Sequence, residues 1–186
     1  TISDLSLGLA AGVSPNNADG IQVGESTGTD KVTISNVTID GFDTGVRFLG
    51  SIGTTEDYVL TGSTIRNVGL GVMVTGNSSA MIEDTLIEDT QEEGIFFTDT
   101  AEDKLLVDNV TIRNFAQDTS FARGAIAWST AGQGVSGTAF DTAVIEVQNS
   151  TFENGPLGLS FDNGDIIVGN NTFRGVKTVI NQNVTT

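Results

Sequence analysis

The sequence contains no cysteine and no histidine among its 186 residues. Without cysteine the chain forms no disulfide bond, so redox chemistry gives no indication of its compartment. Without histidine it lacks both the commonest metal ligand and the commonest general base of enzymes. The sequence is therefore poor in the side chains on which metal binding and acid–base catalysis most often depend.

Basic residues are also scarce, because 8 lysines and arginines stand against 24 acidic residues, which gives a net charge of −16. This charge disfavours nucleic acid and anionic membranes as partners. An acidic chain rich in glycine and threonine suits an extracellular or cell-surface protein, although solubility alone explains the composition equally well.

The length of the chain fits a single domain, residues 1–186. No apolar run approaches the length of a membrane span, so we expect no membrane insertion. The chain begins at Thr1 with no signal region, and we expect it to be a mature or excised piece of a longer protein.

A short phrase that ends in an apolar residue recurs seven times along the chain. Its last residues are Leu7, Ile39, Ile65, Ile87, Ile112, Phe152 and Phe173. The shortest interval, between Phe152 and Phe173, corresponds to one small coil, and the longer intervals contain insertions. A unit of this size cannot bury its own apolar face, so it must stack on copies of itself. The sequence therefore predicts a solenoid.

The coil that begins at Val144 shows how each repeat is built. Ile145 and Val147 alternate with polar residues, a period of two that points both side chains inward. Three short strands separated by polar turns predict an all-β fold, a parallel β-helix with three faces. The predicted strands of this coil are 144–148, 150–152 and 159–161, with turns at Asn149 and at 154–156.

The other coils follow the same pattern, in which Asn-x-Thr-Ile is followed by Gly-apolar-x-apolar. The pattern resembles the right-handed parallel β-helix repeats of the pectin lyase-like superfamily over essentially the whole chain. The resemblance implies a right-handed solenoid of about seven coils with three short parallel strands per coil. It implies no single activity, because this architecture serves lyases, hydrolases, epimerases, phage tailspikes and adhesins alike. The Asp-Asp and Gly-His-Gly motifs of polygalacturonases are absent, as is the arginine-rich signature of pectate lyases.

Equivalent positions of stacked coils form ladders. The turn ladder is expected to point inward and comprises Asp4, Asn36, Gly62, Asp84, Asn109, Asn149 and Asn170. The charge ladder alternates acid and arginine and comprises Asp40, Arg66, Glu88, Arg113, Glu153 and Arg174. Neighbouring members of the charge ladder lie within reach of an ion pair, so we expect its three arginines to have a structural role.

Enzymes of the superfamily usually act on the face of the third strand and on the loops that lead into it. In that region Glu92 or Glu93 lies one coil from Asp118, a pair of carboxylates that would serve as acid and base on a glycosidic bond. Arg47 or Arg123 would then hold an acidic sugar. Acidic residues are abundant in every loop of this chain, so the sequence leans against catalysis and leaves the question open.

A second hypothesis for the same face is carbohydrate binding. Met73, Phe96 and Trp128 would form an apolar strip flanked by Arg47, on which a sugar ring stacks. The alternative is that the insertions 116–123 and 129–142 fold over the strip. No cofactor is indicated: the turns at 99–103 and 162–165 offer oxygen ligands that suit calcium, but turn chemistry explains both.

A third hypothesis concerns the outward side of the first strand. Its successive residues are Thr33, Val59, Met81, Leu106, Glu146 and Ile167. Four of the six, Val59, Met81, Leu106 and Ile167, are apolar where a solvated face is normally polar, so we expect a neighbouring domain or an identical subunit to cover them. The sequence favours an extracellular structural or carbohydrate-binding domain of a surface protein, adhesin or assembly. The alternative is a polysaccharide-degrading hydrolase or lyase.

Overall fold

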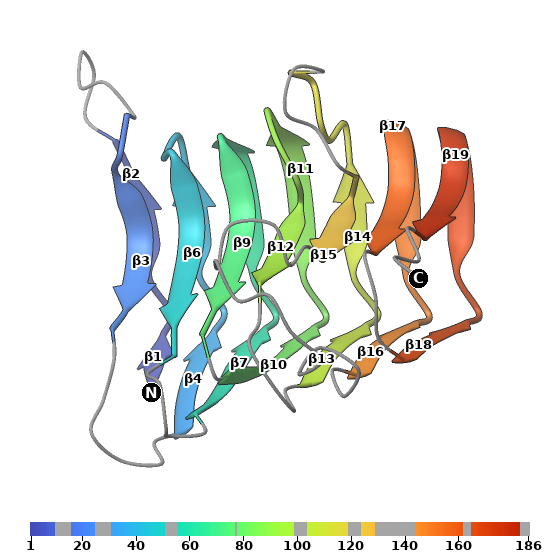
Figure 1. Cartoon of the computed structure of the whole chain (residues 1–186). Helices are drawn as coiled ribbons and strands as arrows, with labels where there is room; N and C mark the ends of the chain where they lie inside the picture. Colours follow the sequence, from blue (N-terminus) through green and yellow to red (C-terminus); the bar gives the residue numbers. More distant parts are fainter. Residues whose placement is uncertain are drawn as a thin grey trace.

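The protein is a rod of stacked solenoid coils, which are called turns below and are seen side-on in Figure 1. This computed structural model describes residues 1–9, 16–24, 31–50, 56–76, 78–98, 104–118, 124–128, 144–161 and 165–182. All regular elements in these ranges are strands, and every strand pairing among them is parallel. The predicted all-β parallel solenoid is confirmed. The described part of the chain contains no helix that could cross a membrane.

The first strand of each turn belongs to a seven-stranded sheet, which we call the first sheet and which runs along the bottom of Figure 1. In spatial order its strands are β1 (Ile2–Ser3), β4 (Lys31–Ser35), β7 (Glu56–Thr61), β10 (Ser78–Glu83), β13 (Lys104–Asp108), β16 (Val144–Gln148) and β18 (Asp165–Gly169). This order follows the sequence, with one coil between neighbours.

The other two faces of the rod form one continuous sheet that folds back at its C-terminal end. The second-strand face consists of β2 (Ser6–Gly8), β5 (Thr38–Asp40), β8 (Thr64–Val68), β11 (Leu86–Thr90) and β14 (Thr111–Arg113). The third-strand face consists of β3 (Asp19–Val23), β6 (Thr44–Leu49), β9 (Leu70–Thr75), β12 (Ile95–Thr98) and β15 (Ile126–Trp128). The long strands β17 (Thr151–Phe161) and β19 (Thr172–Gln182) pass through both faces.

Strand β17 corrects the predicted division of its coil into separate strands at 150–152 and 159–161. Asn154 has the left-handed φ of 59° expected of a turn residue. The strand nevertheless continues through the bend, because β19 pairs with β17 both before Asn154, at Thr151, and after it, at Gly155 and Leu157.

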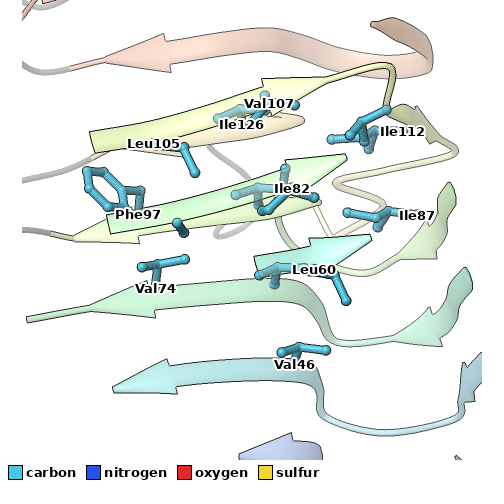
Figure 2. Packing of buried hydrophobic residues seen from close by; sticks show 14 of the residues in the cluster. Val46, Leu60, Val74, Ile82, Ile87, Phe97, Leu105, Val107, Ile112 and Ile126 are labelled. Carbon is cyan, nitrogen blue, oxygen red and sulfur yellow. The ribbon is translucent and has the colours of Figure 1, made fainter. Parts of the chain in front are cut away.

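The core lies between the three faces and is built from like residues stacked in register (Figure 2). Ile65, Ile87 and Ile112 occupy one register position of three successive turns and are completely buried. Each such side chain contributes about 1.5–3 kcal/mol relative to an exposed one. The stacking explains why a short repeat suffices, since each coil supplies the missing wall of its neighbour.

The turn ladder shows the predicted backbone but not the predicted direction. Asn36, Asn109 and Asn149 have left-handed φ angles of 54°, 52° and 50°, yet they are exposed, so the expectation that they point inward is wrong. The inward position is the next residue, such as Val110 or Ser150. The left-handed residue bends the chain from one face of the rod to the next, and its side chain stays outside to bond its neighbour: the Asn109 amide donates to Asp84 at 2.6 Å.

The charge ladder is confirmed, and its six residues form three separate ion pairs. Each arginine bonds the acid of the preceding turn: Arg66 lies 2.9 Å from Asp40, Arg113 bonds Glu88, and Arg174 lies 2.8 Å from Glu153. These three arginines therefore have structural partners.

The number of coils differs slightly from the predicted seven, because the solenoid has about five turns. The first sheet has seven strands, and its two outermost strands, β1 and β18, have a neighbouring strand on one side only. The short phrase appears in these outer turns as well, which is why counting phrases gives the larger number.

Candidate functional site

The third-strand face carries a groove where the sequence predicted a site. We call it the third-strand groove. Its volume is about 270 Å³, and its lining residues are Asp43, Thr44, Arg47, Leu70, Met73, Glu92, Glu93 and Phe96. These residues come from three successive turns around β6, β9 and β12, so the groove runs along the rod.

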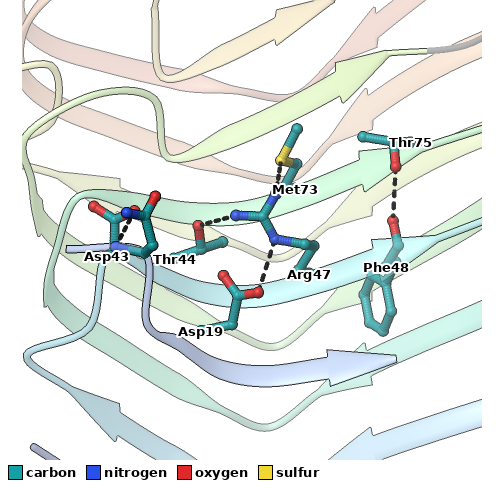
Figure 3. Close-up of polar contacts among 8 residues, drawn as sticks. Asp19, Asp43, Thr44, Arg47, Phe48, Met73 and Thr75 are labelled. Atoms are coloured by element: carbon teal, nitrogen blue, oxygen red, sulfur yellow. Dashed lines mark hydrogen bonds and ion pairs between the residues drawn. The ribbon is translucent and has the colours of Figure 1, made fainter. Parts of the chain in front are cut away.

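Arg47 is fixed in this groove by three partners (Figure 3). Its Nε lies 2.9 Å from Asp19 Oδ2, Nη2 donates to Thr44 Oγ1 at 3.0 Å, and Nη1 approaches Met73 Sδ at 3.2 Å. The side chains of Arg47 and Asp19 are 26% and 15% exposed. The guanidinium is therefore held rigidly, and its charge is largely balanced by Asp19.

The apolar floor of the groove consists of Met73 and Phe96, which are both half-buried. They are register partners on β9 and β12, next to Arg47 on β6. The register continues to Ala127 on β15, which is therefore the outward residue of that strand. The floor ends there, since Ala127 is buried.

Trp128 does not belong to this floor. It follows the outward Ala127, so it points inward, in register with Phe97 and Phe161, and is only 1% exposed. The predicted contact between Trp128 and a sugar ring is therefore wrong, because the indole is part of the core.

The polar wall of the groove lies on the turns that lead into the third strand. The Glu92 amide donates to Gly69 O at 2.8 Å, and the Asp118 amide donates to Gln91 O at 2.8 Å. The predicted pair Glu92 and Asp118 thus lies on adjacent turns. On the other side of Glu92, the Asp43 carboxylate lies over Gly69, its Oδ1 only 3.1 Å from where a Cβ would stand.

Burial raises the pKa of Glu92, and the negative charges of Asp43 and Asp118 raise it further. A glutamate whose pKa is raised beside other carboxyl groups is the kind of residue that serves as a general acid. Glu93 is 4% exposed at the inner edge of the same wall. Arg123, the remaining predicted catalytic residue, lies outside the described residues.

In the described ranges, no three acidic side chains are grouped as metal ligands. Of the two turns considered for calcium, 99–103 lies outside the described residues. In the other turn only Asp165 is described, and it is exposed.

Sequence reasoning missed two partners of Arg47, namely Asp19 and Thr44. Both directly precede the glycine of a Gly-apolar step and are register partners. Leu70 and Glu93 occupy the same position in the next two turns, so the residue before this glycine was the available signal.

A second ladder of left-handed residues was also missed. It follows the charge ladder by one residue and comprises Gly41, Asn67, Asp89, Asn114, Asn154 and Gly175. Its amides bond between turns, as Asn114 does to Asp89 at 2.9 Å. The repeated acid-or-arginine followed by Asn, Asp or Gly carried this signal in the sequence.

The predicted interface residues fall into two groups. Val59, Met81 and Leu106 are register partners on adjacent strands and line a cavity of about 280 Å³, which we call the first-sheet groove. Ile167, which is 50% exposed, lies beyond Glu146 and outside this groove.

A family model described as a right-handed beta helix region matches residues 12–173. No protein of curated function matches the chain. The match covers every turn that contributes to the two grooves.

Proposed function

This chain belongs to the right-handed β-helix family, and we propose that its third-strand groove binds a neutral polysaccharide. In this proposal the chain is a carbohydrate-binding domain of an extracellular or cell-surface protein. The observation that carries the proposal is the half-buried floor of Met73 and Phe96 beside the fixed Arg47.

A sugar ring has an apolar face of C–H groups and an edge of hydroxyl groups. The floor of Met73 and Phe96 suits the apolar face, since thioether and aromatic surfaces pack well against it. Glu92 on the wall offers oxygen atoms to the hydroxyl groups. Binding sites commonly combine an apolar floor with a few such polar groups.

The charge distribution favours a neutral sugar over the acidic one considered in the enzyme hypothesis. Arg47 is already paired with Asp19, so it has little free charge to offer a uronate. The wall contributes Asp43 and Glu92, and the whole chain has a net charge of −16. Both would repel an acidic polysaccharide.

The test is affinity electrophoresis and calorimetry with a panel of neutral and acidic polysaccharides. We expect retention by a neutral polysaccharide, weakened about tenfold by Phe96→Ala, since a stacked ring contributes about 1–2 kcal/mol. Leu86→Ala is the matched control, because Leu86 is an outward, half-buried apolar residue of the second-strand face. Binding that Phe96→Ala leaves unchanged, or a preference for acidic polysaccharides, would contradict the proposal.

A second candidate function is cleavage of the bound polysaccharide. It rests on the raised pKa of Glu92 next to Asp118 and Asp43, with Glu93 and Arg123 as the other candidates from the sequence. Release of sugar fragments by the wild type that is lost in Glu92→Gln, while polysaccharide binding is retained, would establish an enzyme. Retention without release in the wild type would leave binding alone.

A further inference from the structure

We propose that the first-sheet groove is the contact surface of a homodimer, in which β10 of one copy packs on β10 of the other. The proposal is independent of carbohydrate binding, because the two grooves lie on different faces of the rod. It rests on the order of side chains across three neighbouring strands.

The centre of the groove is apolar. Val59 on β7, Met81 on β10 and Leu106 on β13 are register partners, and all three point away from the core and are only partly covered. An apolar row three strands wide on the outer side of a sheet is typical of a surface that another element covers.

The rim of the groove carries charges in a definite order. Asp57, Ser79 and Lys104 are register partners that stand two residues before the apolar row, on the same outward side of their strands. These three strands therefore present an acid, a neutral residue and a base in turn, and Lys31, the register partner of Asp57 on β4, adds a second base outside this row. The order of the three central residues is unchanged when their row is reversed and each charge is replaced by its opposite.

A two-fold axis parallel to β10 produces this reversal. It places β7 of one copy against β13 of the other, so Asp57 meets Lys104 of the second copy on both sides of the axis. Val59 then meets Leu106 of the second copy, and Met81 meets its own equivalent at the centre. An isologous contact requires a surface that is complementary to itself in this way.

Two nearby acids bear on the contact. Lys104 already lies 3.2 Å from Glu146 of its own chain, and an ammonium group with three donors can bond a second carboxylate as well. Glu83 lies two residues after Met81 on β10, so near the axis it approaches Glu83 of the second copy and weakens the dimer. An unrelated acidic or basic partner would be repelled by one end of the rim.

Sedimentation velocity over a concentration series tests the proposal. We expect a monomer–dimer equilibrium that Met81→Glu abolishes and that Leu86→Glu, the same change on the second-strand face, leaves intact. Asp57→Lys and Lys104→Asp should each weaken the dimer at least tenfold. The double variant Asp57→Lys/Lys104→Asp should regain affinity over both single variants, and Glu83→Gln should tighten the dimer.

The exposed charge variants keep the test valid if Met81→Glu fails to fold, which circular dichroism reports. A chain that remains monomeric at millimolar concentration would overturn the proposal. The double variant and Lys104→Asp both place an aspartate beside Glu146, so this repulsion cancels when the two are compared. A double variant that dimerises no more tightly than Lys104→Asp would therefore overturn the proposal too.

Discussion

At the scale of single residues, the turn ladder meets two demands with one residue type. The backbone needs a left-handed φ, which asparagine, aspartate and glycine tolerate best. The exposed side chain also bonds the equivalent residue one turn away, as Asn109 does to Asp84. Gly62 meets the first demand alone, with a φ of 60°.

Substitution of Asn109 separates these two demands. Asn109→Gly keeps the left-handed backbone and loses the amide bond, at a cost of about 0.5–1.5 kcal/mol. Asn109→Ala also strains the backbone, so we expect it to unfold more easily than Asn109→Gly by about 1 kcal/mol. Urea unfolding of both variants measures the difference, and equal stabilities would show that φ is not the constraint.

Glu92 makes stability depend on pH with a definite sign. Its pKa is raised in the folded protein, so between the ordinary glutamate pKa and the raised value the folded state binds more protons than the unfolded state. Stability therefore falls as the pH rises through this window, and the penalty persists above it.

Glu92→Gln removes that penalty. We expect the variant to be more stable than the wild type at pH 7, within the 0.5 kcal/mol or so that is usual for surface changes. The two proteins should converge below the ordinary glutamate pKa, where Glu92 is protonated in both states. Urea unfolding at pH 3.5 and pH 7 provides the comparison, and a less stable variant at pH 7 would contradict the assignment.

At the scale of elements, the corner at the start of β9 depends on Gly71. A Cβ on Gly71 would lie 2.2 Å from the carbonyl oxygen of Gly94 and 2.8 Å from the Ile87 side chain. Neither neighbour can move freely, since one is backbone of the next turn and the other is in the core. We expect Gly71→Ala to destabilise the protein by about 1–3 kcal/mol or more.

Gly24 provides the control for this corner, because a Cβ there would meet nothing within 4 Å. Gly24→Ala should leave the thermal midpoint nearly unchanged, while Gly71→Ala lowers it by several degrees. Equal midpoints in differential scanning calorimetry would mean that the corner relaxes to accept a side chain.

The elements also show how far the sequence alone reaches. Alternation of apolar and polar residues predicts a strand at 144–148, where the structure has β16. A period of two determines which side chains of this strand point inward. Trp128 was misplaced because the insertion before β15 hides which residue starts the alternation. A shift of one residue then exchanges core and surface.

The candidate site was predictable in place but not in detail. The Gly-apolar steps located the third-strand face and its outward residues Arg47, Met73 and Phe96. The ion pair of Arg47 with Asp19 was missed because Asp19 comes from the preceding turn, where only its place before the glycine of a Gly-apolar step marks it. Whether a charge is free or paired depends on such contacts between turns, which composition cannot reveal.

At the scale of the whole molecule, the fold is nearly one-dimensional. Each turn contacts only its neighbours, so stability is close to a sum of turn and interface contributions. The central turns have a neighbour on each side, and Ile87 and Ile112 are fully buried. Among the described residues, the exposed large apolar side chains lie in the outermost turns: Leu5, Ile167, Val168, Val179 and Ile180.

This asymmetry predicts a gradient of local stability along the rod. Amide hydrogen exchange should be slowest in β8, β11 and β14 and should quicken toward β1 and β18, because the outer turns can open without breaking the central interfaces. Ile87→Ala, which leaves a cavity in the central stack, should cost about 2–5 kcal/mol and accelerate exchange on both sides of it. Val179→Ala, at an exposed position of β19, should accelerate exchange only in its own turn. Uniform exchange protection from end to end would instead mean that the chain unfolds as one cooperative unit, with no stable part of the solenoid surviving the loss of another.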